Sequence, residues 1–230
     1  MPDRSAAHKA VDNNYWMRQI KAAELTDDAS ILVVGGDRDE FASLLDHKVN
    51  ASYVDADNLD SSDVLNDVEE DSLDAILVRD ALWQTKNPAA FFDKAQAGLK
   101  PGGHLVIIEP GITLVSWLFY SLGRDARMNF KVDPLADDQR PPRNLARPSL
   151  LFTKLENRIA FMERFPQLHI TKQRWVSMLA GPLSDIRGGY SLIPESAVKG
   201  ILDVEETLSP FLARWLSFRL FIVMEKRAKS

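Results

Sequence analysis

The chain has 230 residues, 45% of them hydrophobic, which is enough to bury the core of one α/β domain. It contains no cysteine, which excludes disulfides and thiolate metal sites, and its four histidines lack ligand spacing, so we expect no bound metal. The net charge of -5 combines an acidic first half with a basic second half, and the dispersed bases argue against a nucleic-acid partner.

Two further features bear on localisation. No apolar run reaches the length of about 20 residues that a helix needs to cross a bilayer. The amino-terminal segment lacks the long apolar core of a signal peptide. We therefore expect a cytoplasmic protein without a transmembrane segment.

The first half of the chain alternates between predicted helices and strands. Residues 12–25 have the apolar spacing of a helix, and residues 31–34 form an apolar run typical of a strand buried on both faces. The glycines at 35–36 then allow a sharp turn into a helix that begins near Asp39. The next predicted elements are strands at 51–54, 73–78 and 104–108, a helix at 88–99 and a turn at 100–103.

The second half is less regular. Residues 112–122 are apolar, and the Pro- and Arg-rich stretch at 132–149 predicts neither helix nor strand. After it, the patterns predict helices at 150–165 and 194–212 and strands at 168–178 and 218–224. In the first of these helices we expect Leu151, Leu155, Ile159 and Phe161 or Met162 to face inward.

Strands separated by helices predict a doubly wound, mostly parallel Rossmann-like sheet with helices on both faces, because parallel neighbours need crossover connections. We expect a single domain over residues 1–230. Its predicted parts are a helical cap at 1–30, a core at 31–110, an insertion or lid after the fourth strand at 111–167, and carboxy-terminal strands and a helix at 168–230.

The turn at residues 35–36 is followed by acids where a nucleotide-binding loop commonly has more glycines. A glycine turn after the first strand, with a carboxylate about 20 residues later, is the layout of a nucleoside site, and here that carboxylate is Asp55. A pyrophosphate over the next helix would be repelled by Asp37, Asp39 and Glu40, so NAD and FAD are poor candidates. A nucleoside with a positive centre would be attracted to this loop, although Asp39 and Glu40 also suit the first turn of a helix.

Three segments give the chain a resemblance to the class I S-adenosylmethionine-dependent methyltransferases over about residues 31–110. They are ILVVGG with Asp55 downstream, SLDAILVRDALWQTKNPAAFF and AGLKPGGHLVIIEP. The resemblance implies a Rossmann-like methyltransferase sheet and S-adenosylmethionine as the cofactor. The cofactor-binding residues that it implies are Gly35, Gly36 and Asp37 in the loop at the methionine end, Asp55 on the ribose hydroxyls, Ala56 and Asp57 near the adenine, and Arg79 and Asp80 at the crevice after the third strand.

The sequence departs from this family in two places. Asp37 and Asp39 stand where the family usually has glycines, and only 17 residues separate Asp55 from Leu73, which is short for the usual intervening elements. One alternative is that Asp55 or Asp57 reads the adenine and the ribose carboxylate is missing. A second alternative is that the fold has lost methyl transfer and acts as a binding or assembly protein, or as a cofactor-independent enzyme.

The substrate contacts are expected from the cap, the crevice and the insertion. Methyl transfer depends mainly on positioning, so no catalytic residue is predicted. The candidates are Tyr15, for which an amphipathic helix face is the alternative, Trp83, Arg143, which could bind an anionic group, and Tyr190. The segments FPQLHI and RGGYSLIPES are similar to family members associated with surface-polysaccharide genes, which implies a small-molecule or glycan-related acceptor.

Two stretches, 112–120 and 208–223, are rich in large apolar residues. Core packing is the favoured interpretation. The alternative is contact with a membrane surface or a lipid-linked substrate, because arginines at 124 and 127 follow the first stretch. The sequence does not predict the oligomeric state.

Overall fold

Six strands form one sheet in the part of the chain that this computed structural model describes. Those parts are residues 5–45, 48–60, 68–122, 128–136, 143–185 and 190–228. The strands are β1 (Ser30–Gly35), β2 (Asn50–Val54), β3 (Leu73–Arg79), β4 (Leu99–Pro110), β5 (Leu168–Val176) and β6 (Arg219–Lys226), in the order β2-β1-β3-β4-β6-β5. The first four are parallel and the last two antiparallel to their neighbours, which confirms the mostly parallel sheet.

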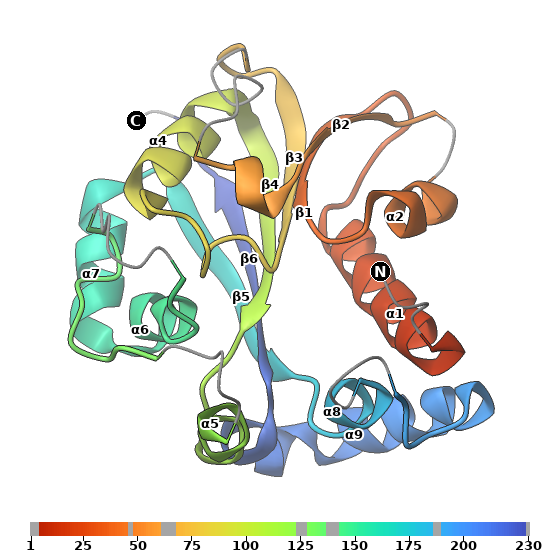
Figure 1. The fold of residues 1–230 in the computed structure, drawn as a ribbon. Helices are drawn as coiled ribbons and strands as arrows, with labels where there is room; N and C mark the ends of the chain where they lie inside the picture. Colours follow the sequence, from red (N-terminus) through yellow and green to blue (C-terminus); the bar gives the residue numbers. More distant parts are fainter. Residues whose placement is uncertain are drawn as a thin grey trace.

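Helices cover both faces of this sheet (Figure 1). On one face lie α1 (Ala6–Ala22) and α2 (Arg38–Leu44), and on the other lie α4 (Pro88–Gly98), α6 (Arg147–Thr153) and α7 (Leu155–Arg164). At the end where the parallel strands finish lie α5 (Leu114–Ser121), α8 (Ala180–Ser184) and α9 (Glu195–Leu216). Within the described residues, no helix is long and apolar enough to cross a bilayer.

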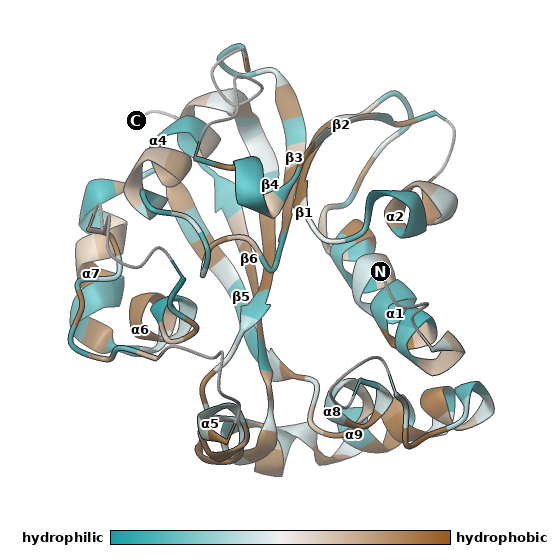
Figure 2. Ribbon diagram, viewed as in Figure 1, coloured by the Kyte–Doolittle hydropathy of each residue, from teal (hydrophilic) through white to brown (hydrophobic). Residues whose placement is uncertain are grey.

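The central strands are apolar on both faces because each face is covered by helices. In β1, Leu32 and Val34 pack toward α4, whereas Ile31 and Val33 pack toward α1. Figure 2 shows the resulting hydrophobic centre of the sheet. Burying each such side chain contributes roughly 1.5–3 kcal/mol, so these strands are the main source of the hydrophobic stabilisation.

A buried polar anchor fixes α1 to the sheet. The Gln19 amide donates hydrogen bonds to the carbonyl oxygens of Val78 on β3 and Val106 on β4, at 2.9 and 3.1 Å. Trp16, on the same helix, is fully buried. The helix therefore has a defined position over the carboxyl ends of the central strands.

The single helix predicted at 150–165 is wrong, because the chain is extended at Lys154 (ψ 125°) and forms α6 and α7 instead. The break changes the face that points inward. Phe161 is buried as predicted, but Leu155 and Ile159 are 72% and 43% exposed.

The turn predicted at residues 100–103, KPGG, lies inside β4 and forms an irregularity in that strand. Leu73 pairs with Leu99 and Ala75 pairs with His104, so β4 advances five residues while β3 advances two.

The interpretation of residues 112–120 as core is also wrong. Helix α5 turns most of its large apolar side chains outward, with Leu114 and Leu118 63% and 55% exposed. Its buried contacts are made by the polar residues Thr113 and Ser116, which form a capping box and reach the backbone of neighbouring segments. The 208–223 stretch is divided: β6 is buried, whereas the end of α9 is largely exposed.

Candidate functional site

The glycine turn after β1 is required by its surroundings. Gly35 and Gly36 have φ values of +74° and +71°, which side chains rarely adopt. A Cβ atom on Gly35 would lie 2.1 Å from the carbonyl oxygen of Arg79, and one on Gly36 would lie 2.3 Å from Cζ2 of Trp16. Gly36 is nevertheless exposed, so the turn is packed on one side and accessible on the other.

The acidic residues after the turn stabilise the amino-terminal end of α2. The Asp37 carboxylate accepts hydrogen bonds from the backbone N–H groups of Asp39 and Glu40, both at 3.1 Å, and caps α2. Asp39 and Glu40 lie in its first turn, where negative charge interacts favourably with the helix dipole. The helix-start interpretation of Asp39 and Glu40 is therefore confirmed.

Asp55 follows β2, which lies directly beside β1 in the sheet. Val34 pairs with Val54, so Asp55 comes at the carboxyl end of β2 next to the glycine turn. Its side chain is exposed, and among the described residues its carboxylate has no hydrogen-bond or ion-pair partner. Ala56, half-buried, begins the 3₁₀ turn η1 (Ala56–Asn58).

Two later segments meet beside this strand end. Arg143 forms an exposed ion pair with Asp57 at 2.7 Å. The backbone N–H of Asn144 donates to the carbonyl oxygen of Trp83 at 2.8 Å. The structure thus brings together the predicted residues Asp57, Trp83 and Arg143 near the ends of β2 and β3.

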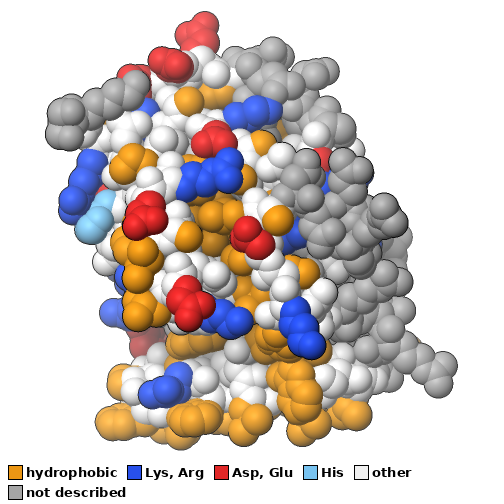
Figure 3. All heavy atoms as spheres, turned by 90° about the vertical axis from the view of Figure 1, so that its left-hand side faces the viewer, with side chains coloured by type: hydrophobic (Ala, Val, Ile, Leu, Met, Phe, Trp, Pro, Cys, Tyr) orange, Lys and Arg blue, Asp and Glu red, His pale blue; other side chains and the backbone are white. Residues whose placement is uncertain are grey.

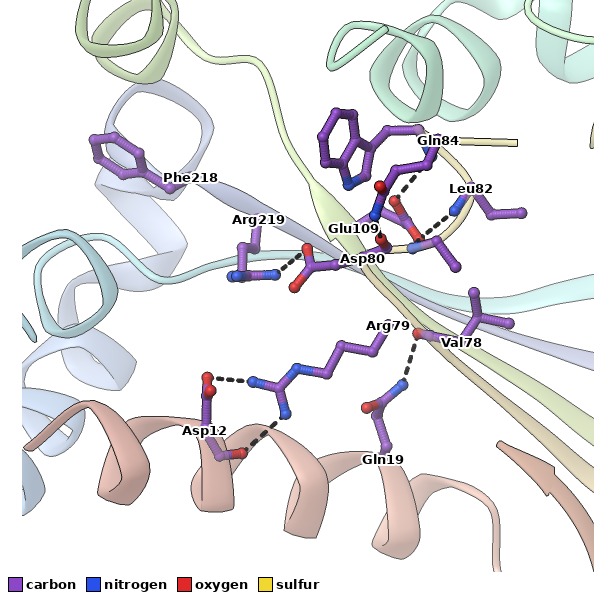
Figure 4. Close-up of polar contacts among 12 residues, drawn as sticks. Asp12, Gln19, Val78, Arg79, Asp80, Leu82, Gln84, Glu109, Phe218 and Arg219 are labelled. Atoms are coloured by element: carbon purple, nitrogen blue, oxygen red, sulfur yellow. Dashed lines mark hydrogen bonds and ion pairs between the residues drawn. The ribbon is translucent and has the colours of Figure 1, made fainter. Parts of the chain in front are cut away.

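Arg79 has a different environment from the predicted open crevice. It is 2% exposed and points toward α1, where it bonds to the carboxylate and the carbonyl oxygen of Asp12 (Figure 4). Its guanidinium carbon lies 4.7 Å from the centre of the Trp16 ring. Its Cδ lies 3.3 Å from the position of a Cβ on Gly36, so Arg79 supports the turn from behind.

Asp12 carries the matching charge for this buried arginine. Burial acts to raise the pKa of Asp12, but the hydrogen bond with His8 and the charges of Arg79 and Arg219 outweigh it and lower the pKa from 3.8 to about 2. The carboxylate therefore stays ionised at neutral pH, and α1 and β3 are joined by a charged pair.

Asp80 and Glu109 organise the loop after β3. Asp80 has a φ of +52°, and its side chain points away from that of Arg79 to pair with Arg219 on β6 at 2.5 Å (Figure 4). The fully buried Glu109, at the end of β4, accepts hydrogen bonds from the backbone N–H groups of residues 81–83 at 2.7, 2.8 and 3.2 Å. Burial and the charge of Asp80 raise the pKa of Glu109 to about 8, against the effect of these three donors.

Glu109 was not among the predicted site residues. Its signal in the sequence was its place in IIEP, directly after a buried apolar run and at the carboxyl end of a predicted strand. Such positions lie at the edge of a parallel sheet where ligands bind.

The two tyrosines differ in their exposure to solvent. Tyr15 is 1% exposed, burial raises its pKa, and it lines a cavity of about 430 Å³ between α1, β5 and α9. Its ring centre lies 5.9 Å from the guanidinium carbon of Arg219. Tyr190 is 77% exposed, between α8 and α9. Within the described ranges, no group of three His, Asp or Glu side chains could hold a metal ion.

Comparisons with known proteins agree with this fold. The family described as "Methyltransferase domain" matches residues 9–145, which is more than half of the chain and includes the glycine turn and the carboxyl ends of β1 to β4. Among curated protein sequences, none matches.

Three solved structures are similar to this chain at low sequence identity. A SAM-dependent methyltransferase from Archaeoglobus fulgidus is 13% identical, with 95% of this chain and 94% of that chain covered and a TM-score of 0.52. A putative methyltransferase from Bacillus halodurans is 14% identical, with 93% and 99% covered and a TM-score of 0.45. A geranyl diphosphate C-methyltransferase from Streptomyces coelicolor, in complex with Mg²⁺, geranyl diphosphate and S-adenosylhomocysteine, is 11% identical, with 94% and 79% covered and a TM-score of 0.49.

The similarity to the Archaeoglobus fulgidus structure extends over nearly the whole of both chains, and it supports the Rossmann-like fold. The family match rests on the sequence itself. The chain therefore belongs to the methyltransferase family, whose methyl donor is S-adenosylmethionine.

Proposed function

We propose that this protein transfers the methyl group of S-adenosylmethionine to a small-molecule or glycan-related acceptor. The observation that carries the proposal is the accessible glycine turn at residues 35–36 beside the Asp55 carboxylate, which has no partner in the described part of the chain. When bound, the cofactor supplies an activated methyl group on a positively charged sulfur. The chain supplies the site that binds and orients it.

The residues around the turn fit such a cofactor. Gly36 has no side chain to keep a ligand from the backbone, and Asp55 can accept hydrogen bonds from both ribose hydroxyls. Because β2 lies next to β1, Asp55 has the place of a ribose carboxylate, which supports the ribose role over the adenine role. Ala56 and Asp57, next along the chain, would then face the adenine.

The charged residues nearby act in different ways. Asp37 caps α2, and together with Asp39 and Glu40 it gives the loop a negative potential that favours a cationic cofactor. Arg79 holds the turn in place from behind and does not contact the cofactor in this proposal. Asp80 borders the crevice, with Arg219 as its counter-charge.

Catalysis follows from positioning. Methyl transfer needs the nucleophile in line with the methyl group and water excluded, and no general base is assigned. Trp83 would close one side of the acceptor site, and Arg143 could exchange Asp57 for an anionic acceptor group because both side chains are exposed. Tyr15 and Tyr190 are the remaining candidates for acceptor contacts.

Calorimetric titration with S-adenosylmethionine and S-adenosylhomocysteine tests the proposal. Asp55→Ala should weaken binding roughly 10- to 100-fold, since it removes hydrogen bonds to a charged acceptor. The control is Asp93→Ala, which removes an exposed acid on α4. Equal affinities of the two variants would rule out the role of Asp55, and absence of binding by the unaltered protein would leave a methyltransferase fold used for another purpose.

A second titration separates the ribose role from the adenine role. The 2′-deoxy analogue of S-adenosylhomocysteine lacks one of the hydroxyls that Asp55 would bind. If Asp55 reads the ribose, removing this hydroxyl weakens binding to the unaltered protein and has little further effect on Asp55→Ala. Additive losses would instead support the adenine role.

A further inference from the structure

Helices α5 and α9 expose a group of large apolar side chains at one end of the molecule. We call this group the apolar end surface. On α5 and just after it Leu114, Leu118 and Leu122 are 63%, 55% and 70% exposed, and on α9 Phe211 is 75% exposed. The complete set is Leu114, Val115, Trp117, Leu118, Phe119, Leu122, Leu208, Phe211, Leu212 and Trp215.

The two helices form one surface. They lie in contact with each other at the lower end of the molecule in Figure 1. In Figure 2 both helices carry hydrophobic residues, which alternate with polar ones along α9. Phe119 packs against Phe218, two residues after α9, and Thr113 donates a hydrogen bond to the carbonyl oxygen of Ser217. Figure 3 shows hydrophobic side chains gathered along this same lower end. A single flat partner could therefore contact both helices.

The apolar end surface contains a single charged side chain. Residues 114–122 contain no charged side chain, and residues 208–216 contain one, Arg214. Arg214 is exposed and lies over the Trp215 ring, 5.1 Å from its centre, and it has no carboxylate partner among the described residues. Leucines, tryptophans and an exposed cation are typical of helices that rest in the headgroup layer of a bilayer.

The lone cation distinguishes a bilayer from a second copy of the chain. In a symmetric dimer the surface would face itself, and Arg214 would meet a patch that contains no acid. Its charge would be removed from water without a counter-charge, which is unfavourable. Anionic headgroups supply that counter-charge.

We propose that the apolar end surface docks onto an anionic lipid bilayer, with the side chains of α5 and α9 inserted among the headgroups and the helices lying parallel to the membrane. Arg219, which pairs with Asp80, follows Phe218 directly. The docked protein would thus hold the carboxyl ends of β3 and β4 close to the bilayer. If the proposed function holds, an amphiphilic acceptor in the membrane would be within reach.

Sedimentation with vesicles measures the docking directly, without cofactor or acceptor. The unaltered protein should bind vesicles of phosphatidylcholine mixed with phosphatidylglycerol. Leu118→Glu and Phe211→Glu should each lower the partition coefficient by roughly tenfold or more. The matched control is Leu155→Glu on α7, a leucine 72% exposed on another face, which should bind as the unaltered protein does.

Two further measurements keep the outcomes distinct. Brominated lipids should quench the fluorescence of Trp117 and Trp215, and Trp117→Phe and Trp215→Phe should reduce the quenching. Arg214→Gln should weaken binding to anionic vesicles and leave binding to pure phosphatidylcholine unchanged.

The proposal is overturned if the unaltered protein stays in solution, or if Leu155→Glu loses as much binding as Leu118→Glu. It is also overturned if light scattering finds a dimer that Phe211→Glu dissociates while vesicles are not bound, because a second copy is then the partner. None of these results depends on methyl transfer, so failure here leaves the proposed function untouched.

Discussion

Arg219 on β6 and Asp80 after β3 form an ion pair at 2.5 Å across 139 residues of sequence. The pair links the antiparallel part of the sheet to the loop at the candidate site. Asp80 has a left-handed backbone conformation, so its side chain is held in place both by the pair and by the turn. The backbone N–H of Asp80 also donates to the carbonyl oxygen of Ile108, which fixes the same loop to β4.

A double-mutant cycle tests this pair. Arg219→Met should lower the free energy of unfolding by about 3 kcal/mol because it leaves the Asp80 charge without a partner. Asp80→Asn keeps the left-handed turn, since asparagine tolerates that conformation, and adding it to Arg219→Met should recover part of the loss. Urea unfolding gives the four values.

The surface pair of Arg143 and Asp57 is the matched control for this cycle. Both side chains are more than half exposed, at 57% and 73%, so Arg143→Met should change the free energy of unfolding by less than about 1 kcal/mol. If Arg219→Met has an equally small effect, Asp80 and Arg219 do not organise the loop.

The glycine turn makes a second prediction. Gly36→Ala places a Cβ against the Trp16 ring at a φ of +71°, and it should lower the free energy of unfolding by about 2–4 kcal/mol. Gly200→Ala is the control, because Gly200 lies inside α9 with nothing within 4 Å of the added atom. It should stabilise the protein by about 0.5–1 kcal/mol. Thermal unfolding of both variants should therefore give shifts of opposite sign.

The lowered pKa of Asp12 predicts how the free energy of unfolding changes at low pH. Its pKa is about 2 in the folded protein and 3.8 in the unfolded chain, so the unfolded state binds more protons between these values. The contribution of Asp12 is complete above pH 3.8 and is lost as the pH falls toward 2, by roughly 2 kcal/mol. Unfolding of Asp12→Asn should lack this part of the pH dependence, whereas Asp93→Asn, which alters an exposed acid, should retain it.

The sequence predicted the elements whose pattern is local. The continuous apolar runs of β1, β3 and β4 and the glycine turn indicate buried parallel strands and a sharp connection whatever their neighbours are. The position of Asp55 followed from the same order of strands. The break at Lys154 could not be predicted, because the aromatic cluster of Phe152, Phe161 and Phe92 forms only when α4, α6 and α7 pack together.

The site residues also divide into those whose position follows from the local pattern and those whose position depends on distant contacts. Strand alternation places Arg79 on the face of Ala75 and Leu77, toward α1, so its direction could have been predicted from parity alone. Its partner Asp12 could not, because 67 residues separate the two. The exposure of α5 was missed because an apolar helical pattern normally indicates burial, and nothing local in the sequence distinguishes an outward face from an inward one.

The raised pKa of Glu109 predicts how the free energy of unfolding changes as the pH rises from 4.5 to 8. Its folded-state pKa of about 8 lies above the ordinary 4.5, so between these values the folded protein holds a proton that the unfolded chain releases. The stability that Glu109 contributes is complete below 4.5 and falls as the pH rises toward 8, because Glu109 of the unfolded chain ionises in this window while burial and the charge of Asp80 keep the folded carboxyl protonated. Glu109→Gln keeps a neutral side chain at every pH, so its free energy of unfolding should vary less over this window.

Urea unfolding at a series of pH values between 4.5 and 8 compares the free energies of unfolding of the unaltered protein and Glu109→Gln. Asp12→Asn is the control: it should leave this part of the pH dependence unchanged while it alters the part at low pH. Parallel curves for the unaltered protein and Glu109→Gln would mean that the three backbone donors of residues 81–83 keep Glu109 ionised throughout.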